Sequence, residues 1–493
     1  MKPIIFVAME PTSYVAYFTL MDQILRLLKR KGLSVAGKCN VEIIYIPERL
    51  LSPNRLNFSF DVIDINVTFT RVFPSLLRLL LTFLVSFFVS LYLYFKLIVT
   101  DKDFRALSFN GIFIGDSLLS VALRRSSSPS FKLGFRFFLY ILRAINIIQL
   151  TKSLEINQKA DFYLLFDWHY YERILYKCLA GGKVKLIDSL CYDRRESIKE
   201  IHPLVDCAPF VVKKRKFSLN NLRRKEVDKF FKLRFDNPSS FQWYLSGNGN
   251  LNSEYILDED GQTLFLPDNG YVACIFLHSF VDGYVDTVWD GFIDQLEYLK
   301  FLIEKILVCG FYDEILIKPH PQTFSSIYPT DEKGIEYLKR IFGNKIKFLN
   351  KRASLVALSK GNIICFSHHG SVVEECHYLG MPCVGFKHGP WREYSEFLYI
   401  WESKSDLERL IDLGPKKLPY LDSDIFYKYV YEYRLCHKVS IKNTFLENAA
   451  NTFSIPYNKT FEFGHEIAKF VEIYGLFESL RKVAIEYKKN LSD

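Results

Sequence analysis

The sequence lacks paired cysteines, a second long apolar run and any low-complexity tract. None of its ten cysteines stands at CxxC spacing, and several lie inside apolar, strand-like runs. This pattern predicts buried, reduced thiols of a cytosolic protein rather than a disulfide framework. The closest approach to metal-ligand spacing is the group His368, His369, Cys376 and His377, which matches no standard zinc site. We therefore predict no metal and no bound cofactor.

The composition is that of a globular chain long enough for two or more domains. Of its 493 residues, 49% are hydrophobic and 24% are charged, which excludes a disordered chain, a coiled coil and a collagen-like repeat. The net charge of +9 is too small for this length to indicate nucleic-acid binding. Residues 1–265 hold 37 Lys+Arg and 25 Asp+Glu, whereas the remainder holds 27 and 30. Such a basic first half favours anionic lipid headgroups or phosphorylated substrates as partners.

Two segments of the first half bear on membrane contact. Residues 79–95 form a 17-residue stretch without charge inside a predicted apolar helix at 75–99. Seventeen residues is the lower limit for crossing a bilayer, so we expect a buried or interfacial helix rather than a span. Residues 213–225 carry seven basic side chains and no acid, which fits a solvated helix face or a membrane-docking segment. No signal peptide is evident at the start of the sequence.

Short apolar strands alternate with helices in both halves, which predicts an α/β fold of two doubly wound Rossmann-type domains. We expect an acceptor-side domain over 1–265, a nucleotide-sugar-type domain over 266–420, and C-terminal helices over 421–493 that pack back on the first domain. The expected strands lie at 3–8, 41–46, 161–166 and 184–187, and then at 271–277, 314–319, 346–349, 362–366 and 383–386. Ligands of such sheets bind outside the carboxyl ends of strands. The predicted site therefore comprises loops at 278–291, 318–323 and 367–375.

Two of these loops have the features of a phosphate site. In IKPHPQT, Lys318 and His320 end a strand, and Pro321 stiffens the turn. In SHHGS, His369 and Gly370 precede Ser371, which is placed to cap a helix whose amides would face an anion. Glu374 or Glu375, one turn into that helix, could accept hydrogen bonds from ribose. The alternatives are a plain proline turn and a capped amphipathic helix with surface glutamates.

Candidate acid–base residues follow other predicted strands. His278 and Asp282 come after the strand at 271–277, where a carboxylate could serve as a general base. The alternative is a simple turn, because Asp282 precedes glycine. In the first half, Asp116 follows the segment NGIFIG, and Asp167, His169 and Tyr170 follow the strand at 161–166. Those residues could line an acceptor side, or they could belong to a capped helix and an aromatic helix start.

The order strand–HSFVD–helix–IKPHP–helix–strand–HHGSVVEECHYLGMPCV resembles the donor half of GT-B glycosyltransferases over about 271–392. More narrowly it is similar to the bacterial capsule and lipopolysaccharide biosynthesis group, which includes the capsular Kdo transferases. NGIFIGD at 110–116 is a weaker match, and the two histidines before Gly370 depart from a common pattern of the group. The tail after residue 386 is only loosely similar.

The resemblance implies a metal-independent enzyme with two domains facing a cleft. It implies that His320 contacts donor phosphate, that Ser371 and the amides near Gly370 bind phosphate or nucleotide, and that Asp282 lies near the reacting carbon. We expect a CMP-, UDP- or GDP-linked donor and a glycan or lipid-linked acceptor of surface polysaccharide. The expected location is cytoplasmic, peripheral on the inner face of the membrane.

Three other functions stay open from the sequence. A teichoic-acid-type polyol-phosphate transferase would share the scaffold and the HP turn, and a UDP-sugar 2-epimerase would share the glycine and glutamate pattern. A non-catalytic scaffold or export-coupling subunit would keep the sheets without the chemistry. The general base stays open among Asp282, Asp116, Asp167 and His169.

Overall fold

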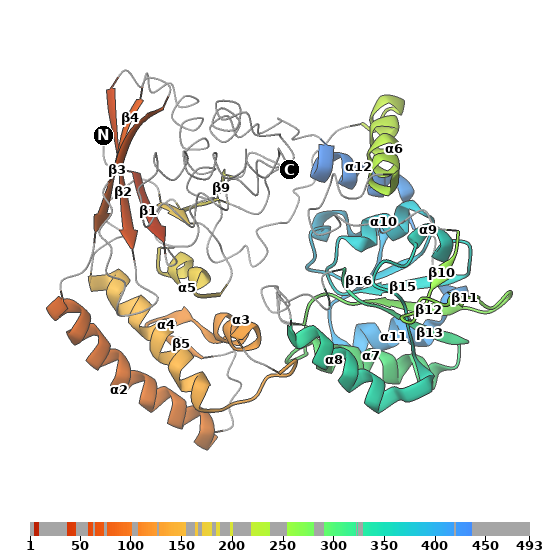
Figure 1. Ribbon diagram of the computed structural model, residues 1–493, viewed down its shortest axis with the longest axis horizontal. Helices are drawn as coiled ribbons and strands as arrows, with labels where there is room; N and C mark the ends of the chain where they lie inside the picture. The colour runs from red at the N-terminus through yellow and green to blue at the C-terminus, as the bar shows by residue number, and fades with distance from the viewer. Residues whose placement is uncertain are drawn as a thin grey trace, which may run out of the picture. The chain divides into compact units, whose positions relative to one another are not determined.

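The computed structural model divides the chain into two compact units (Figure 1). The first comprises Met1–Leu118, Gly134–Asp206 and His437–Asp493, and the second comprises Leu119–Leu133 and Cys207–Cys436. The second unit thus begins before residue 265, at which the sequence predicts the boundary. The structure describes residues 4–8, 37–45, 58–62, 65–72, 76–100, 107–125, 128–153, 163–165, 170–179, 184–187, 198–200, 218–236, 254–280, 290–321, 323, 329–418 and 421–435.

The first unit is built on a mainly parallel sheet. Its strands are β1 (Ile4–Ala8), β2 (Gly37–Tyr45), β3 (Phe58–Val62), β4 (Ile65–Val72), β7 (Tyr163–Leu165), β8 (Val184–Ile187) and β9 (Ile198–Glu200). They lie in the order β3-β4-β2-β1-β7-β8-β9, with antiparallel pairing only at the two edges among these described strands. The predicted α/β character of this half is therefore confirmed.

Helices accompany this sheet. They are α2 (Leu76–Thr100), α4 (Phe135–Ser153) and α5 (Tyr170–Leu179), and α3 (Gly115–Arg125) lies at the border of the two units. A small hairpin of β5 (Ser108–Phe109) and β6 (Ile112–Phe113) precedes α3. Its turn places Asn110 and Gly111 at φ 51° and 77°, the left-handed pair that a two-residue Asn-Gly hairpin requires. Within the described residues, only α2 is long and apolar enough to cross a membrane by length and composition.

The second unit has a wholly parallel six-stranded sheet. Its strands are β12 (Val272–Phe276), β13 (Glu314–Lys318), β14 (Lys347–Phe348), β15 (Ile363–Ser367), β16 (Cys383–Phe386) and β17 (Tyr399–Trp401). Their order is β14-β13-β12-β15-β16-β17, so in sequence order the strands run 3-2-1-4-5-6. This is the doubly wound dinucleotide-binding order, whose ligand crevice lies where the order reverses. Here that point falls between β12 and β15, and the predicted fold of this half is confirmed.

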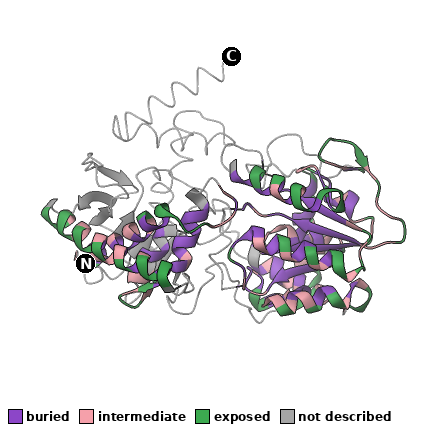
Figure 2. Cartoon of the chain, turned by 90° about the horizontal axis from the view of Figure 1, so that it is seen from below, coloured by how far each residue is buried: buried purple, intermediate pink, exposed green. Residues whose placement is uncertain are grey.

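Helices cover both faces of this sheet. Figure 1 shows α7 (Gln295–Cys309), α8 (Pro329–Phe342) and α11 (Lys404–Leu413) on one face, with α9 (Leu355–Leu358) and α10 (Val372–Tyr378) on the other. Because helices cover both faces, every residue of β12, β15 and β16 is buried, and these strands are continuous apolar runs (Figure 2). Asp294 begins α7 by accepting from the Glu297 amide at 2.9 Å, and left-handed Gly310 ends it. A short hairpin of β10 (Ile256–Leu257) and β11 (Thr263–Leu264) precedes β12.

Two further helices pack against the core of the second unit. They are α6 (Asn221–Asp236) and α12 (Ser423–Val430), which is followed by a π-helical turn at Tyr431–Leu435. Phe231 of α6 stacks on Tyr378 at 4.3 Å and on Phe426 of α12 at 5.9 Å between ring centroids. This packing explains why the second unit includes α6, although the sequence places it in the first domain. The predicted helix at 465–489 lies outside the described residues.

Candidate functional site

Three histidines predicted from the sequence converge at the carboxyl edge of the second sheet. His278 follows β12, His320 follows β13 and His369 follows β15. The ring centroid of His278 lies 4.3 Å from that of His369 and 5.7 Å from that of His320. All three side chains are half-buried. The cluster therefore spans the point between β12 and β15 where the strand order reverses.

Hydrogen bonds hold the chain next to two of these histidines, His278 and His320. Ser279 Oγ and the Phe280 amide donate to one oxygen of Asp331 at 3.0 and 2.9 Å, which ties the loop after β12 to the start of α8. The Thr323 amide donates to the His320 carbonyl at 2.9 Å, which closes the turn that contains Pro321. These bonds fix the histidine backbones on the sheet, where a binding group needs its support.

A buried relay stands behind His369. Nδ1 of His369 lies 2.7 Å from Nδ1 of His368, and Nε2 of His368 lies 2.9 Å from Oδ2 of Asp290. The exposed fractions of His368 and Asp290 are 2% and 3%. Phe386 stacks on His368 at 4.8 Å, and the Phe292 amide donates to the other oxygen of Asp290 at 2.9 Å. Carboxylate, imidazole and imidazole thus form one hydrogen-bonded chain that orients the His369 ring.

From the sequence alone, neither Asp290 nor His368 has a predicted role in the site. Asp290 lies within the predicted loop 278–291, where attention falls on the earlier Asp282. The sequence does contain a turn signal at this point, an aspartate followed by glycine. In the structure Gly291 has φ 92° and turns the chain toward α7. The doublet of histidines after β15 is the second signal, since one ring supports the other.

Lys318 and Ser371 have different surroundings from those predicted. Lys318 is buried and donates to the Lys351 carbonyl at 2.9 Å. Burial lowers the pKa of this amine, and the nearby Glu375 carboxylate opposes that lowering. Ser371 stands at the start of α10, as predicted, but its side chain makes no capping hydrogen bond to the described residues of this helix. Gly370 closes the preceding loop, because its amide donates to Ser367 Oγ at 3.3 Å.

Glu374 and Glu375 form buried ion pairs. Glu374 accepts two bonds from Arg434, each 2.8 Å long, and a third from the Tyr429 hydroxyl at 3.0 Å. Glu375 pairs with Arg234 of α6. The exposed fractions of the two glutamates are 3% and 9%. These contacts hold α6 and the π-helical turn Tyr431–Leu435 on α10, so they favour a structural role over the predicted ribose contact.

In the first unit, Asp116 links two helices. Its carboxylate lies 2.8 Å from Lys177 Nζ and 3.1 Å from Arg173 on α5. Burial raises the pKa of Asp116, but Arg173 and Lys177 more than offset this and hold it below its usual value. A doubly paired, ionised carboxylate suits an anchor better than the predicted general base. Asp167, His169 and Asp282 lie outside the described residues, and of Tyr170 only the backbone is described, as the first residue of α5.

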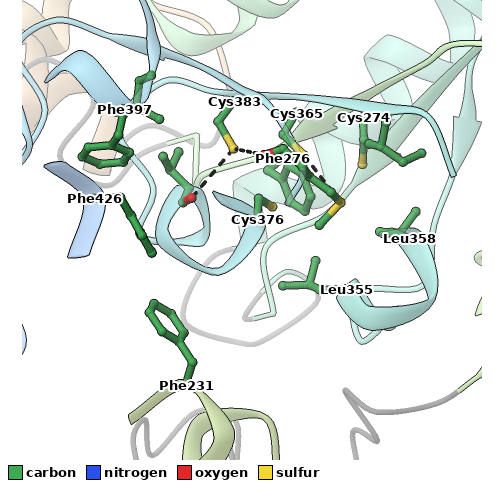
Figure 3. Close-up of a cluster of buried hydrophobic side chains, with 14 of the residues drawn as sticks. Phe231, Cys274, Phe276, Leu355, Leu358, Cys365, Cys376, Cys383, Phe397 and Phe426 are labelled. Atoms are coloured by element: carbon green, nitrogen blue, oxygen red, sulfur yellow. Dashed lines mark hydrogen bonds between the residues drawn. The ribbon is translucent and has the colours of Figure 1, made fainter. Parts of the chain in front are cut away.

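The cysteines predicted to be buried thiols gather in the core of the second unit (Figure 3). Cys274, Cys365 and Cys383 are register partners on β12, β15 and β16, and Cys376 of α10 covers them. The Sγ atoms of Cys365, Cys376 and Cys383 lie within 4.8 Å of one another, so they are a possible soft-metal ligand set in the described residues. Burial raises the pKa of Cys365 and Cys376, which favours neutral thiols packed as small apolar groups at these two positions. Burial also raises the pKa of Cys383, but hydrogen bonds with the Cys365 and Cys376 thiols more than offset this and lower it to about 6. The prediction of buried, free thiols is confirmed for these four, whereas Cys178 and Cys309 are half-buried.

Comparisons with known proteins add little to this geometry. No protein-family model matches the sequence, and no curated protein matches it. Solved structures that align with it include a UDP-forming α,α-trehalose-phosphate synthase from Burkholderia vietnamiensis, with 10% identity and a TM-score of 0.32 over 92% of this chain and 100% of that one. A second is a structure of trehalose-6-phosphate from Escherichia coli bound with UDP-2-fluoro glucose. It has 10% identity and a TM-score of 0.31 over 90% of this chain and 96% of that one. Scores this low do not select a fold, which rests instead on the two sheets described above.

Proposed function

We propose that the chain is a glycosyltransferase that moves a sugar from a nucleotide-sugar donor to an acceptor hydroxyl. The observation that carries the proposal is the convergence of His278, His320 and His369 where the 3-2-1-4-5-6 strand order reverses. Sheets of this order bind nucleotides in the crevice outside the carboxyl ends of their strands. The motif resemblance over 271–392 points to the same class of enzyme.

The histidine cluster suits the phosphate part of such a donor. A protonated imidazole donates charge-assisted hydrogen bonds to phosphate oxygens, and these are shorter and stronger than neutral ones. Imidazole also changes charge near neutral pH, so the same ring can bind an anion and then release it. The relay from Asp290 through His368 fixes which face and which nitrogen His369 presents.

In the proposed reaction the acceptor oxygen attacks the anomeric carbon of the donor sugar. The bond from that carbon to the donor phosphate oxygen breaks, and the electron pair leaves with the nucleotide. Cationic histidines would stabilise the negative charge that develops on the leaving phosphate. A general base takes the proton of the acceptor hydroxyl, and Asp282 stays the sequence-based candidate for that role.

We propose the classes of donor and acceptor from the sequence alone. The donor is a CMP-, UDP- or GDP-linked sugar, and the acceptor is a glycan or lipid-linked precursor of capsule or lipopolysaccharide. The chain would then act in the cytoplasm at the inner face of the membrane. The nucleotide-sugar is a substrate, so the proposal includes no cofactor and no metal.

Calorimetric titration of the purified chain with CMP, CDP, UDP, GDP and their sugar conjugates tests the proposal. We expect one nucleotide class to bind, and we expect His278→Ala, His320→Ala and His369→Ala each to weaken it at least tenfold, about 1.4 kcal/mol per tenfold. His377→Gln is the matched control, because His377 packs on Phe397 and Phe426 in the same unit and lies outside the cluster.

Two results would contradict the proposal. Absence of binding by every nucleotide and conjugate would favour a non-catalytic scaffold. Equal affinity in the wild type and all three alanine variants, each shown to be folded by circular dichroism, would place nucleotide binding elsewhere. Selective binding of CDP-linked polyols would support the teichoic-acid-type alternative.

A further inference from the structure

The outward face of α2 in the first unit is a continuous apolar stripe. Figure 2 colours many residues of this helix as exposed. The large apolar side chains that are half exposed or more recur every three or four residues: Leu77, Leu80, Leu81, Leu84, Val85, Phe88, Tyr92, Phe95, Ile98 and Val99. Single apolar side chains on a surface are ordinary, but a contiguous stripe of this length marks an interaction surface.

The inward face of α2 mixes polar and apolar side chains. Ser86 and Ser90 are completely buried there, beside the buried Leu93 and Leu97. Ser86 Oγ satisfies itself locally by donating to the Thr82 carbonyl at 2.6 Å. Phe87 and Tyr94 of α2 pack edge-on against Phe138 of α4, each at 5.8 Å between ring centroids. A helix on a water-exposed surface has the opposite pattern, with its apolar side inward, so the stripe is built for a medium other than water.

The charges on this helix pair have one sign. In their sequences α2 and α4 carry five basic residues and no acidic one: Arg78, Lys96, Arg136, Arg143 and Lys152. The neighbouring α4 also exposes Phe135 and Leu139, at 69% and 45%. An apolar stripe on a pair of helices whose own charges are all cationic is complementary to anionic headgroups over an acyl region. It is poorly suited to a second copy of itself, because the like charges would face each other.

We propose that α2 docks this unit on an anionic bilayer by lying in the interface, parallel to the membrane surface. The stripe enters the acyl boundary, and the basic side chains remain among the headgroups. The whole helix is long enough to cross a membrane, but its uncharged stretch between Arg78 and Lys96 has 17 residues, about 26 Å at 1.5 Å per residue, against a ~30 Å hydrocarbon core. Because α4 also covers one side of the helix, α2 lies on the membrane rather than across it. This inference does not depend on the proposed glycosyl transfer.

Flotation of the full chain with vesicles tests the docking. We expect binding to phosphatidylcholine vesicles that contain 30% phosphatidylglycerol, and at least tenfold weaker binding to phosphatidylcholine alone or in 0.5 M salt. Leu84→Ser combined with Phe88→Ser should lower the partition constant at least tenfold. Val308→Ser is the matched control, because Val308 is 84% exposed on α7 of the other unit. Lys96→Gln combined with Arg136→Gln should reduce both the binding and its salt dependence.

Three outcomes would overturn the proposal. The first is no binding at excess anionic lipid. The second is retention of membrane-bound wild type after alkaline carbonate extraction, which would indicate a spanning helix. The third is a dimer in light scattering that the serine pair converts to a monomer, which would show that a second copy covers the stripe. Each variant is first checked for an unchanged thermal unfolding midpoint, and nucleotide affinity measured in parallel separates this result from that for the proposed function.

Discussion

Nε2 of His368 lies 2.9 Å from Oδ2 of Asp290, and both side chains are buried beside the histidine cluster. In the arrangement with an ionised Asp290 carboxylate, which can only accept, and a neutral His368 ring, that ring carries its proton on Nε2 and accepts at Nδ1. The Nδ1 proton of His369 therefore points at His368 across 2.7 Å. The other ring nitrogen of His369 is Nε2. In this arrangement Asp290 determines, through His368, which nitrogen of His369 carries the proton.

Asp290→Asn should reverse this relay. The amide nitrogen of asparagine can donate to Nε2 of His368, which would move the ring proton to Nδ1 and the His369 proton to Nε2. We expect nitrogen-15 spectra of labelled histidine to show His368 changing tautomer, and the free energy of unfolding to fall by about 1–3 kcal/mol. Unchanged ring-nitrogen shifts in the variant would mean that Asp290 does not orient His368. Nucleotide affinity of the same variant then reports whether the orientation matters for binding.

Glu374→Gln should cost much of the stability of the second unit. Glu374 and Arg434 are 4% and 3% exposed in their side chains, and the variant leaves the arginine charge buried without its partner. Breaking such a pair costs about 3–5 kcal/mol, as urea unfolding would measure. The half-buried pair Lys305–Glu408, whose side chains are 34% and 41% exposed, is the comparison, and Glu408→Gln should change stability by less than about 1 kcal/mol.

The combined variant Glu374→Met with Arg434→Met should be less destabilised than either single methionine variant, because neither member of this pair is left as a buried charge without the other. If Glu374→Gln kept wild-type stability and lost nucleotide affinity, the ribose contact expected from the sequence would be correct after all.

The central parallel strands follow from the sequence more fully than the edges of the sheets do. β12, β13, β15 and β16 are buried apolar runs flanked by polar loops, and such runs stand out without knowledge of their neighbours. The antiparallel hairpin of β3 and β4 and the last strand β17 are not anticipated, because their stability comes from pairing with strands distant in sequence.

The site shows the same division between local and distant information. The ends of strands place His278, His320 and His369 together, since parallel strands deliver their loops to one edge. Glu374 and Glu375 have the sequence of a surface helix turn, and only the packing of α6 and the π-helical turn on α10 reveals their arginine partners. Asp290 reaches His368 over 78 residues of chain, a pairing that no spacing rule indicates.

Gly334→Ala should disturb the loop that carries His278. A methyl group at Gly334 of α8 would lie 2.6 Å from two ring atoms of Phe280, so the ring must move. Although alanine is the better helix former, overpacking of this kind costs about 1–3 kcal/mol. We expect thermal unfolding to shift downward and nucleotide affinity to fall. Gly134→Ala is the control, because its methyl group would meet nothing within 4 Å. A Gly334→Ala protein as stable as wild type would show that Phe280 is not packed on α8.

His377 should make the second unit less stable as the pH falls below 6.5. Its ring packs against Phe397 and Phe426, with centroids 5.3 and 4.5 Å away, and burial lowers its pKa to about 4. The unfolded chain, with a histidine pKa of about 6.5, binds a proton between these values that the folded chain does not. The contribution of His377 is therefore constant above pH 6.5 and declines toward pH 4.

At pH 5 this linkage predicts a loss of about 2 kcal/mol relative to pH 7.5. His377→Gln cannot take up that proton. The free energy of unfolding of the wild type minus that of the variant should therefore be about 2 kcal/mol lower at pH 5 than at pH 7.5. Urea unfolding of both proteins at pH 7.5 and pH 5 measures the difference directly, and acid effects common to both cancel in the comparison. A difference that stays constant with pH would mean that the His377 ring is open to water and titrates as it does in the unfolded chain.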